Sequence, residues 1–117
     1  MNGSRNFHAG RVAEERVADS YRRSGHQVAA SRWRGKSGEI DLILSSPEGL
    51  VFVEVKKSTS FARAAENLGA RQIRRLFNAA QEFLGVRGFT LDTPMRFDVA
   101  LVDGAGNIDI LPNALCA

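Results

Sequence analysis

The chain has 117 residues and a mass of 12.8 kDa, the size of one compact domain, which excludes an enzyme with separate cofactor and substrate lobes. We therefore expect a single domain over residues 1–117. Hydrophobic residues make up 44% and charged residues 25% of the chain, which excludes a disordered or collagen-like protein. The formal net charge of +3 permits a polyanionic partner without requiring one.

Basic residues are concentrated at the start of the chain. Residues 1–36 hold eight basic and three acidic residues, residues 37–84 hold six of each, and residues 85–117 hold two basic and four acidic residues. A second basic cluster, formed by Arg71, Arg74 and Arg75, is hidden within the neutral middle third. These two segments are where a polyanion would be expected to bind.

The residue types limit the kind of metal site that the chain can form. One cysteine, Cys116, and two histidines, His8 and His26, do not make a zinc-type ligand set, so any metal would be a hard cation held by carboxylates. The first residues, 1–8, lack the apolar stretch of a secretory signal, and apolar runs such as Leu50–Val53 are far shorter than the roughly 20 residues of a membrane helix. Because Cys116 has no partner for an intrachain disulfide, we expect a cytoplasmic protein. Because the apolar runs are too short to cross a bilayer, we expect no membrane partner.

Helix and strand signals follow one another in an order typical of an α/β fold. The patterns predict a helix over residues 9–24, a strand over 27–30, a basic and glycine-bearing loop over 32–38 that reads as a turn or mobile segment, strands over 39–44 and 50–56, an irregular connection over 58–69, a helix over 70–84 stopped by Gly85, and strands over 95–102 and 108–111. The strongest signal is the hairpin formed by the second and third strands. The order predicts one mixed sheet with helices on its faces.

The register of this hairpin determines which polar side chains lie together. With a loop over residues 46–49, paired residues have numbers that sum to 95, as Ser45 and Leu50 do, and Asp41 lies opposite Glu54. Strand alternation then puts Glu39, Asp41, Glu54 and Lys56 on one face, and Ile40, Leu42, Leu44, Val51, Val53 and Val55 on the other.

Asp41 and Glu54 carry like charges at opposed positions, where Cβ atoms lie about 4.5–5.5 Å apart and repulsion destabilises a sheet. A divalent cation would offset this repulsion, because two carboxylates with water and phosphate oxygens are a typical environment of Mg²⁺. Lys56 could then orient or activate a water, or neutralise charge that develops on a phosphate. The pattern predicts metal-assisted phosphodiester hydrolysis.

A structural alternative fits the same spacing. Acid and lysine pairs across exposed antiparallel strands are common on protein surfaces, and a one-residue slip would separate Asp41 from Glu54. Against this, both strands are rich in aliphatic residues, which favours central strands rather than solvent-exposed edges. Charges on central strands require a reason.

The hairpin sequence also resembles a known family. Residues Gly38–Ile43 (GEIDLI) followed by Val51–Lys56 (VFVEVK) are similar to the signature of the YraN-like family, uncharacterised bacterial proteins with a restriction-endonuclease-like fold. The flanking matches are Gly10-Arg11, Ala13-Glu14, Ala79-Ala80, Phe83-Leu84 and Arg96–Val99, so the resemblance covers most of the chain. It implies an α/β, restriction-endonuclease-like three-layer sandwich with a central mixed β-sheet flanked by helices.

More broadly, an acid followed by Glu-x-Lys resembles the PD-(D/E)xK nuclease core, which includes archaeal Holliday junction resolvases. The resemblance implies Asp41 and Glu54 as ligands of Mg²⁺ or Mn²⁺, the Val55 carbonyl as a further ligand, Lys56 as the catalytic lysine and Glu14 as a helix-borne acid that completes the site. The chain departs from the family at Arg32, where Asn is usual, and at Gln72, where Lys is usual.

Three of the acids have other interpretations. Without the resemblance, Glu14 reads as a solvated residue that complements the dipole near a helix start. Glu39 has Lys56 as its cross-strand neighbour, which allows a simple ion pair. Asp98 either supports the site or ends a strand.

Basic residues form two candidate surfaces for a nucleic acid. Arg32, Trp33, Arg34 and Lys36 directly precede the acidic hairpin, and Arg71, Arg74 and Arg75 lie opposite the apolar stripe of the later helix. Arginine and lysine position phosphates, and a tryptophan stacks on an unpaired base. The alternatives are a solvated helix face and, for Trp33, a packing role in the core or at its rim. No base-reading motif is present, which favours recognition of structure rather than sequence.

Two classes of function follow. The first is a metal-dependent nuclease that acts on DNA, including branched or damaged DNA, and the second is a catalytically silent nucleic-acid-binding module with a nuclease-like fold. A third class, a protein-interaction domain, would bind without the steep salt dependence of phosphate contacts. The choice of DNA over RNA and the oligomeric state stay open, although a homodimer would suit a small nuclease that acts on two strands.

Overall fold

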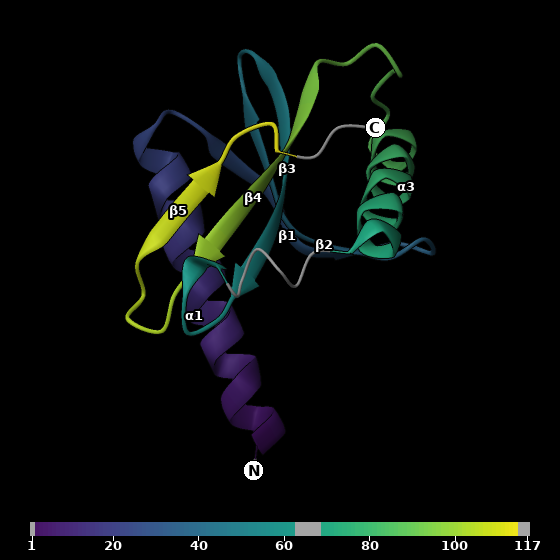
Figure 1. Cartoon of the computed structure of the whole chain (residues 1–117). Coiled ribbons are helices and arrows are strands. Elements are labelled where there is room, and N and C mark those ends of the chain that lie inside the picture. The colour runs from purple at the N-terminus through teal and green to yellow at the C-terminus, as the bar shows by residue number, and fades with distance from the viewer. Residues whose placement is uncertain (1, 63–68, 115–117) are drawn as a thin grey trace.

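A computed structural model describes residues 2–62 and 69–114, with side chains from residue 10 onward (Figure 1). Its elements are α1 (Asn2–Arg23), β1 (Gln27–Arg34), β2 (Glu39–Ser46), β3 (Gly49–Lys57), α3 (Ala70–Val86), β4 (Met95–Val102) and β5 (Ile108–Leu111). This order confirms the predicted succession of helices and strands. The predicted connection over residues 58–69 lies partly outside the described residues.

The five strands form one mixed sheet in the order β1-β2-β3-β4-β5. Strands β3 and β4 are parallel, and every other neighbouring pair is antiparallel. A parallel pair needs a crossover connection, and α3 lies within that connection. The strand that carries Glu54 and Lys56 is therefore the centre of the sheet, as the aliphatic pattern of the hairpin predicts.

Helices cover both faces of the sheet (Figure 1). On one face α1 packs against alternate strand residues, in a buried cluster that includes Val17, Tyr21, Leu42, Leu44 and Val53. On the other face α3 packs in a second cluster that includes Ile43, Phe52, Leu76, Ala80 and Phe83. The result is a three-layer α/β sandwich with a restriction-endonuclease-like arrangement. No helix in residues 2–62 or 69–114 is long and apolar enough to cross a membrane.

Both helices are longer than the sequence pattern predicts. Helix α1 begins at Asn2 rather than residue 9, because one glycine, Gly10, disfavours a helix by only about 1 kcal/mol and does not end it. Helix α3 ends at Val86, so Gly85 lies inside the helix. The turn that follows uses Gly88, which has a φ of 77°, and this glycine takes the role expected of Gly85.

The basic segment after residue 31 is a strand rather than a loop. Trp33 pairs with Ile40 and Arg34 with Glu39, so β1 continues to Arg34. Basic side chains are tolerated there because β1 is an edge strand. Only residues 35–38 form the connection to β2, and the Glu82 carboxylate on α3 fixes them by accepting the N–H groups of Lys36 at 2.8 Å and Ser37 at 3.0 Å.

Asp98 on β4 has a role that differs from both sequence interpretations. It is completely buried on the α1 face and accepts hydrogen bonds from the Tyr21 hydroxyl at 2.6 Å, the Arg96 Nε at 3.1 Å and the Asn113 N–H at 2.8 Å. Burial and the bond to Asp98 raise the pKa of Tyr21, which keeps its hydroxyl protonated as a donor. Asp98 therefore joins α1 and the end of the chain to the sheet.

The turn of the β2–β3 hairpin depends on Gly49. Its φ is 133°, and a Cβ there would lie 2.3 Å from the Pro94 carbonyl oxygen, which accepts the Leu50 N–H at 2.9 Å. The hairpin that carries Asp41 and Glu54 is thus fixed against the start of β4 by a contact that only glycine permits.

We expect Gly49→Ala to lower the free energy of unfolding by roughly 2 kcal/mol or more, because the new methyl group meets backbone and the φ is strained. The matched control is Gly85→Ala, where a Cβ meets nothing within 4 Å and a helix interior gains about 0.5–1 kcal/mol. Urea unfolding followed by circular dichroism measures both. Equal stability of the two variants would contradict the assignment of the turn.

Candidate functional site

The predicted hairpin register is confirmed. Pairs from Ser45 with Leu50 to Leu42 with Val53 all have numbers that sum to 95. Beyond Leu42 the backbone ladder stops, and the Asp41 carboxylate accepts the Val55 N–H at 2.9 Å. The strands therefore separate at Asp41, and its side chain replaces the missing backbone acceptor.

The end of the ladder also changes which way Ile40 faces. The predicted alternation put Ile40 beside Leu42, but Ile40 packs in the α3 cluster and Leu42 in the α1 cluster. Strict alternation holds only where the β2–β3 pairing continues, and this pairing ends before Ile40. The prediction for Ile40 was therefore wrong, whereas Leu42, Leu44, Val51, Val53 and Val55 lie on the α1 face as expected.

Asp41 and Glu54 line one small cavity of about 250 Å³ between the sheet and the start of α3. Burial raises the pKa of Asp41 to about 6, and the negative charges of Glu14 and Glu39 add to this effect against the bond from Val55. Burial and the charge of Asp41 raise the pKa of Glu54 to about 7. The two groups titrate as a coupled pair that resists carrying two negative charges.

Lys56 and Gln72 complete the polar contacts of Glu54. The Lys56 Nζ lies 3.4 Å from Glu54 Oε1 and donates to Gln72 Oε1 at 3.0 Å, while Gln72 Nε2 donates to the same Glu54 oxygen at 2.8 Å. The ion pair considered between Glu39 and Lys56 does not form, because Glu39 pairs with Arg34 Nη2 at 2.9 Å. Lys56 is thus directed at the carboxyl pair.

Gln72 is a site residue that the sequence did not identify as one. In the sequence, Gln72 stands out only as a position where the resembled family usually has Lys. It precedes buried Leu76 by one helical turn, however, and so faces the sheet. That spacing is the signal that could have found it. An uncharged amide here donates to Glu54 and accepts from Lys56, which a lysine could not do.

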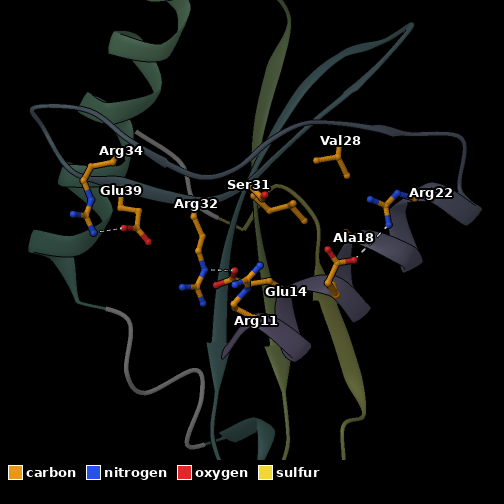
Figure 2. A pocket seen from close by; sticks show the side chains of 11 residues that line it. Arg11, Glu14, Ala18, Arg22, Val28, Ser31, Arg32, Arg34 and Glu39 are labelled. Carbon is orange, nitrogen blue, oxygen red and sulfur yellow. Dashed lines mark hydrogen bonds and ion pairs between the residues drawn. The ribbon is translucent and has the colours of Figure 1, made fainter. Parts of the chain in front are cut away.

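Glu14 lies beyond the carboxyl pair, on the α1 side. Its Oε1 accepts a hydrogen bond from Arg32 Nε at 2.7 Å (Figure 2). Glu14 is near enough to raise the pKa of Asp41, but in residues 2–62 and 69–114 no three His, Cys, Asp or Glu side chains are grouped to hold a metal. The structure thus brings together two of the predicted acids and holds the third by an arginine.

The donor chemistry of the pair fits a hard cation such as Mg²⁺ or Mn²⁺. Carboxylate and carbonyl oxygens are the ligands that these ions prefer, and the mutual repulsion of Asp41 and Glu54 is the feature that a bound cation would relieve. The Val55 carbonyl belongs to the residue whose N–H fixes Asp41.

The predicted nucleic-acid-binding residues are divided between two elements. Arg32, Trp33 and Arg34 lie on β1, and the Trp33 ring packs edge-on against Phe83 of α3 with 5.4 Å between centroids, which supports the packing interpretation of Trp33. Lys36 is exposed in the following turn.

On α3 the arginines differ in position. Arg71, Arg74 and Arg75 are all exposed, and the Arg75 side chain also lies over Gly38 and lines the cavity of Asp41 and Glu54. A Cβ on Gly38 would lie 2.7 Å from Arg75 Cγ, so the glycine lets this arginine approach.

The fold is an α/β sandwich of the restriction-endonuclease-like kind. Residues 13–102 match the family described as "Uncharacterised protein family UPF0102", and the chain belongs to this family. Similar proteins include a UPF0102 protein of Ruegeria pomeroyi, 56% identical over 96% of this chain and 91% of its own length. A UPF0102 protein of Cereibacter sphaeroides strain KD131 is 53% identical over the full length of both chains.

We expect the wild type without metal to lose stability relative to the Asp41→Asn/Glu54→Gln variant as the pH rises. A folded pKa raised above its unfolded value of about 4 gives stability that is full below pH ~4 and lost as the pH rises through ~6–7. Urea unfolding in EDTA at pH 5 and pH 8 should change the difference between the two proteins by roughly 2 kcal/mol. Parallel pH profiles would contradict the coupled pair.

Proposed function

We propose that this protein is a Mg²⁺- or Mn²⁺-dependent nuclease that hydrolyses phosphodiester bonds of DNA, with branched or structured DNA as its substrate. The observation that carries the proposal is the pair of carboxyls formed by half-buried Asp41 and buried Glu54, with the Lys56 ammonium 3.4 Å from the Glu54 carboxylate. A surface ion pair would not explain this arrangement, because it lies at the end of a hairpin that includes the central strand.

Each residue has a defined task in this proposal. Asp41, Glu54 and the Val55 carbonyl would hold the cation, which supplies a Lewis acid and an activated water when bound. Lys56, positioned by the Gln72 carbonyl oxygen, orients that water or neutralises the negative charge that develops on the phosphate. Glu14 would join the other acids after exchanging its bond to Arg32.

The basic residues support DNA as the partner. Arg32, Arg34 and Lys36 lie on the β1 side of the carboxyl pair, and Arg71, Arg74 and Arg75 lie on the α3 side. A strand that crosses the site would meet positive charge before and after the scissile phosphate. Such contacts recognise the phosphate backbone rather than the bases. A single cysteine also fits a protein that acts in the cytoplasm.

We expect Lys56→Ala and Asp41→Asn each to abolish Mg²⁺- or Mn²⁺-dependent cleavage of a branched DNA, by at least a hundredfold, while the variants stay folded and still bind DNA. The matched control is Lys57→Ala, which removes an exposed lysine one position later and should leave cleavage unchanged. Gel assays with end-labelled DNA measure the rates.

Two outcomes would overturn this function. If Lys56→Ala cuts as fast as the wild type, the role of the lysine is wrong. If the wild type cuts no branched, single-stranded or duplex DNA with either metal yet binds it, the protein is the catalytically silent binding module.

We expect removal of Arg71 and Arg74 to weaken DNA binding evenly across sequences. Each phosphate contact contributes about 0.9 to the slope of log K against log salt, so the double alanine variant should lower the slope by roughly 2. Arg23→Ala, an exposed arginine at the end of α1, is the control. Fluorescence anisotropy at several salt concentrations measures the slope, and an unchanged slope would exclude this helix face from the DNA interface.

A further inference from the structure

A second cavity, larger than that of the carboxyl pair, lies between α1 and β1. Its volume is about 480 Å³, within the range of roughly 300–1,000 Å³ that is typical of small-ligand pockets. Figure 2 shows Arg32 reaching across it to Glu14, with Arg34 and Glu39 near one end and Arg22 near the other. This cavity is on the face of the sheet opposite α3.

The walls of the cavity combine an apolar floor with a cationic rim. Ala18, Val28 and Leu42 supply apolar side chains, and the exposed Ser31 lies on the β1 wall. Four arginines line the cavity, namely Arg11, Arg22, Arg32 and Arg34. A ligand with a flat apolar part and an anionic group matches these two surfaces.

The backbone of β1 is strained at the residue that crosses the cavity. Arg32 has a φ of 49°, a left-handed conformation that is uncommon for residues other than glycine. Ser31 and Arg32 are neighbours in sequence and yet both line the cavity, which regular strand alternation would not allow. Backbone strain of this kind costs about 1–3 kcal/mol and is concentrated at functional sites, which supports a site here.

The guanidinium groups of the rim already bind anions. Glu14 accepts from Arg32 at 2.7 Å, and Glu39 accepts from Arg34 at 2.9 Å. The Arg34–Glu39 pair is open to solvent, with side chains 80% and 36% exposed, and exposed pairs of this kind contribute little free energy. A phosphate can therefore replace the Glu39 carboxylate at Arg34 at small cost, whereas the Arg32–Glu14 pair, with side chains 30% and 15% exposed, is held more firmly.

The cavity also shares a lining residue with the cavity of the carboxyl pair. Glu39 lines both cavities, and it precedes Asp41 by two residues on β2. A group bound under Arg32 and Arg34 would thus lie next to the position where the proposed function puts the scissile phosphate.

We propose that this cavity binds one unpaired nucleoside phosphate unit, with the base on the apolar floor and the phosphate at Arg32 and Arg34. The identification of the ligand as a nucleotide rests on the proposed function. A base inside a duplex is stacked and paired, so only a nucleotide at a frayed end, overhang or branch point can enter. The substrate class is therefore DNA with an unpaired nucleotide beside the cleaved bond.

Binding without metal tests this assignment separately from catalysis. In EDTA, calorimetry with dTMP and anisotropy with a labelled duplex carrying a three-nucleotide overhang are compared with the same duplex made blunt. Ser31→Tyr fills the cavity without changing its charge, and Gln27→Tyr is the matched control on β1, exposed and outside the cavity. Arg34→Ala removes one phosphate donor, with Arg23→Ala as its control.

We expect the overhang duplex to bind about tenfold more tightly than the blunt duplex, and both Ser31→Tyr and Arg34→Ala to remove that difference while the controls keep it. Binding of dTMP with the same response to the variants, but no gain from the overhang, would support the cavity with a free nucleotide as its source. The assignment is overturned if neither probe binds, or if the cavity variants behave like their controls. If the wild type shows this binding pattern but does not cleave DNA in Mg²⁺, the proposed nuclease function is wrong and the assignment of the cavity stands.

Discussion

Two carboxyl groups, those of half-buried Asp41 and buried Glu54, lie beside each other in one cavity, and their repulsion is the constraint on which the site depends. The hydrogen bond from the Val55 N–H holds Asp41 where the backbone ladder ends, and the contacts from Lys56 and Gln72 hold Glu54. These contacts fix the geometry but do not fully offset the cost of burial and of the mutual repulsion. The pKa of each carboxyl therefore stays above its ordinary value. The fold thus holds the two carboxyls in an arrangement that is costly in the metal-free protein and that a bound cation would stabilise.

The parts of the fold that the sequence predicted are those set by local patterns. The β2–β3 register followed from a short loop between two aliphatic runs, because the length of a hairpin loop fixes which residues pair. The adjacency of Asp41 and Glu54 followed from that register. The predicted helix ends were wrong next to glycines that a helix tolerates, because Gly10 and Gly85 both lie inside helices.

The features that could not be predicted depend on contacts between distant segments. The bond between Tyr21 and Asp98 joins residues 77 positions apart, and the placement of Gln72 beside Glu54 requires the packing of α3 on the sheet. The residues around Arg32 give no signal of its left-handed conformation, and its hydrogen bond to Glu14 joins residues 18 positions apart. Long-range partners of this kind determine the site after the strands have determined the fold.

The small net charge conceals this organisation. In the cavity between α1 and β1, arginines on β1 pair with acids on α1 and β2. These opposite charges cancel in the net charge, although the arginines can still bind a phosphate that replaces an acid. Glu39 lines both the arginine-lined cavity and the cavity of the carboxyl pair. Metal chemistry and strand binding would accordingly be adjacent in a domain with little room for a separate recognition module.

The most direct measurement is a crystal of the protein soaked in Mn²⁺ at pH 8, recorded for anomalous scattering. We expect a manganese peak between the carboxylates of Asp41 and Glu54, and we expect Asp41→Asn crystals soaked in the same way to lose it. A map with no peak at this position in high Mn²⁺, or a peak that Asp41→Asn leaves unchanged, would contradict the assignment of these two acids as the metal site.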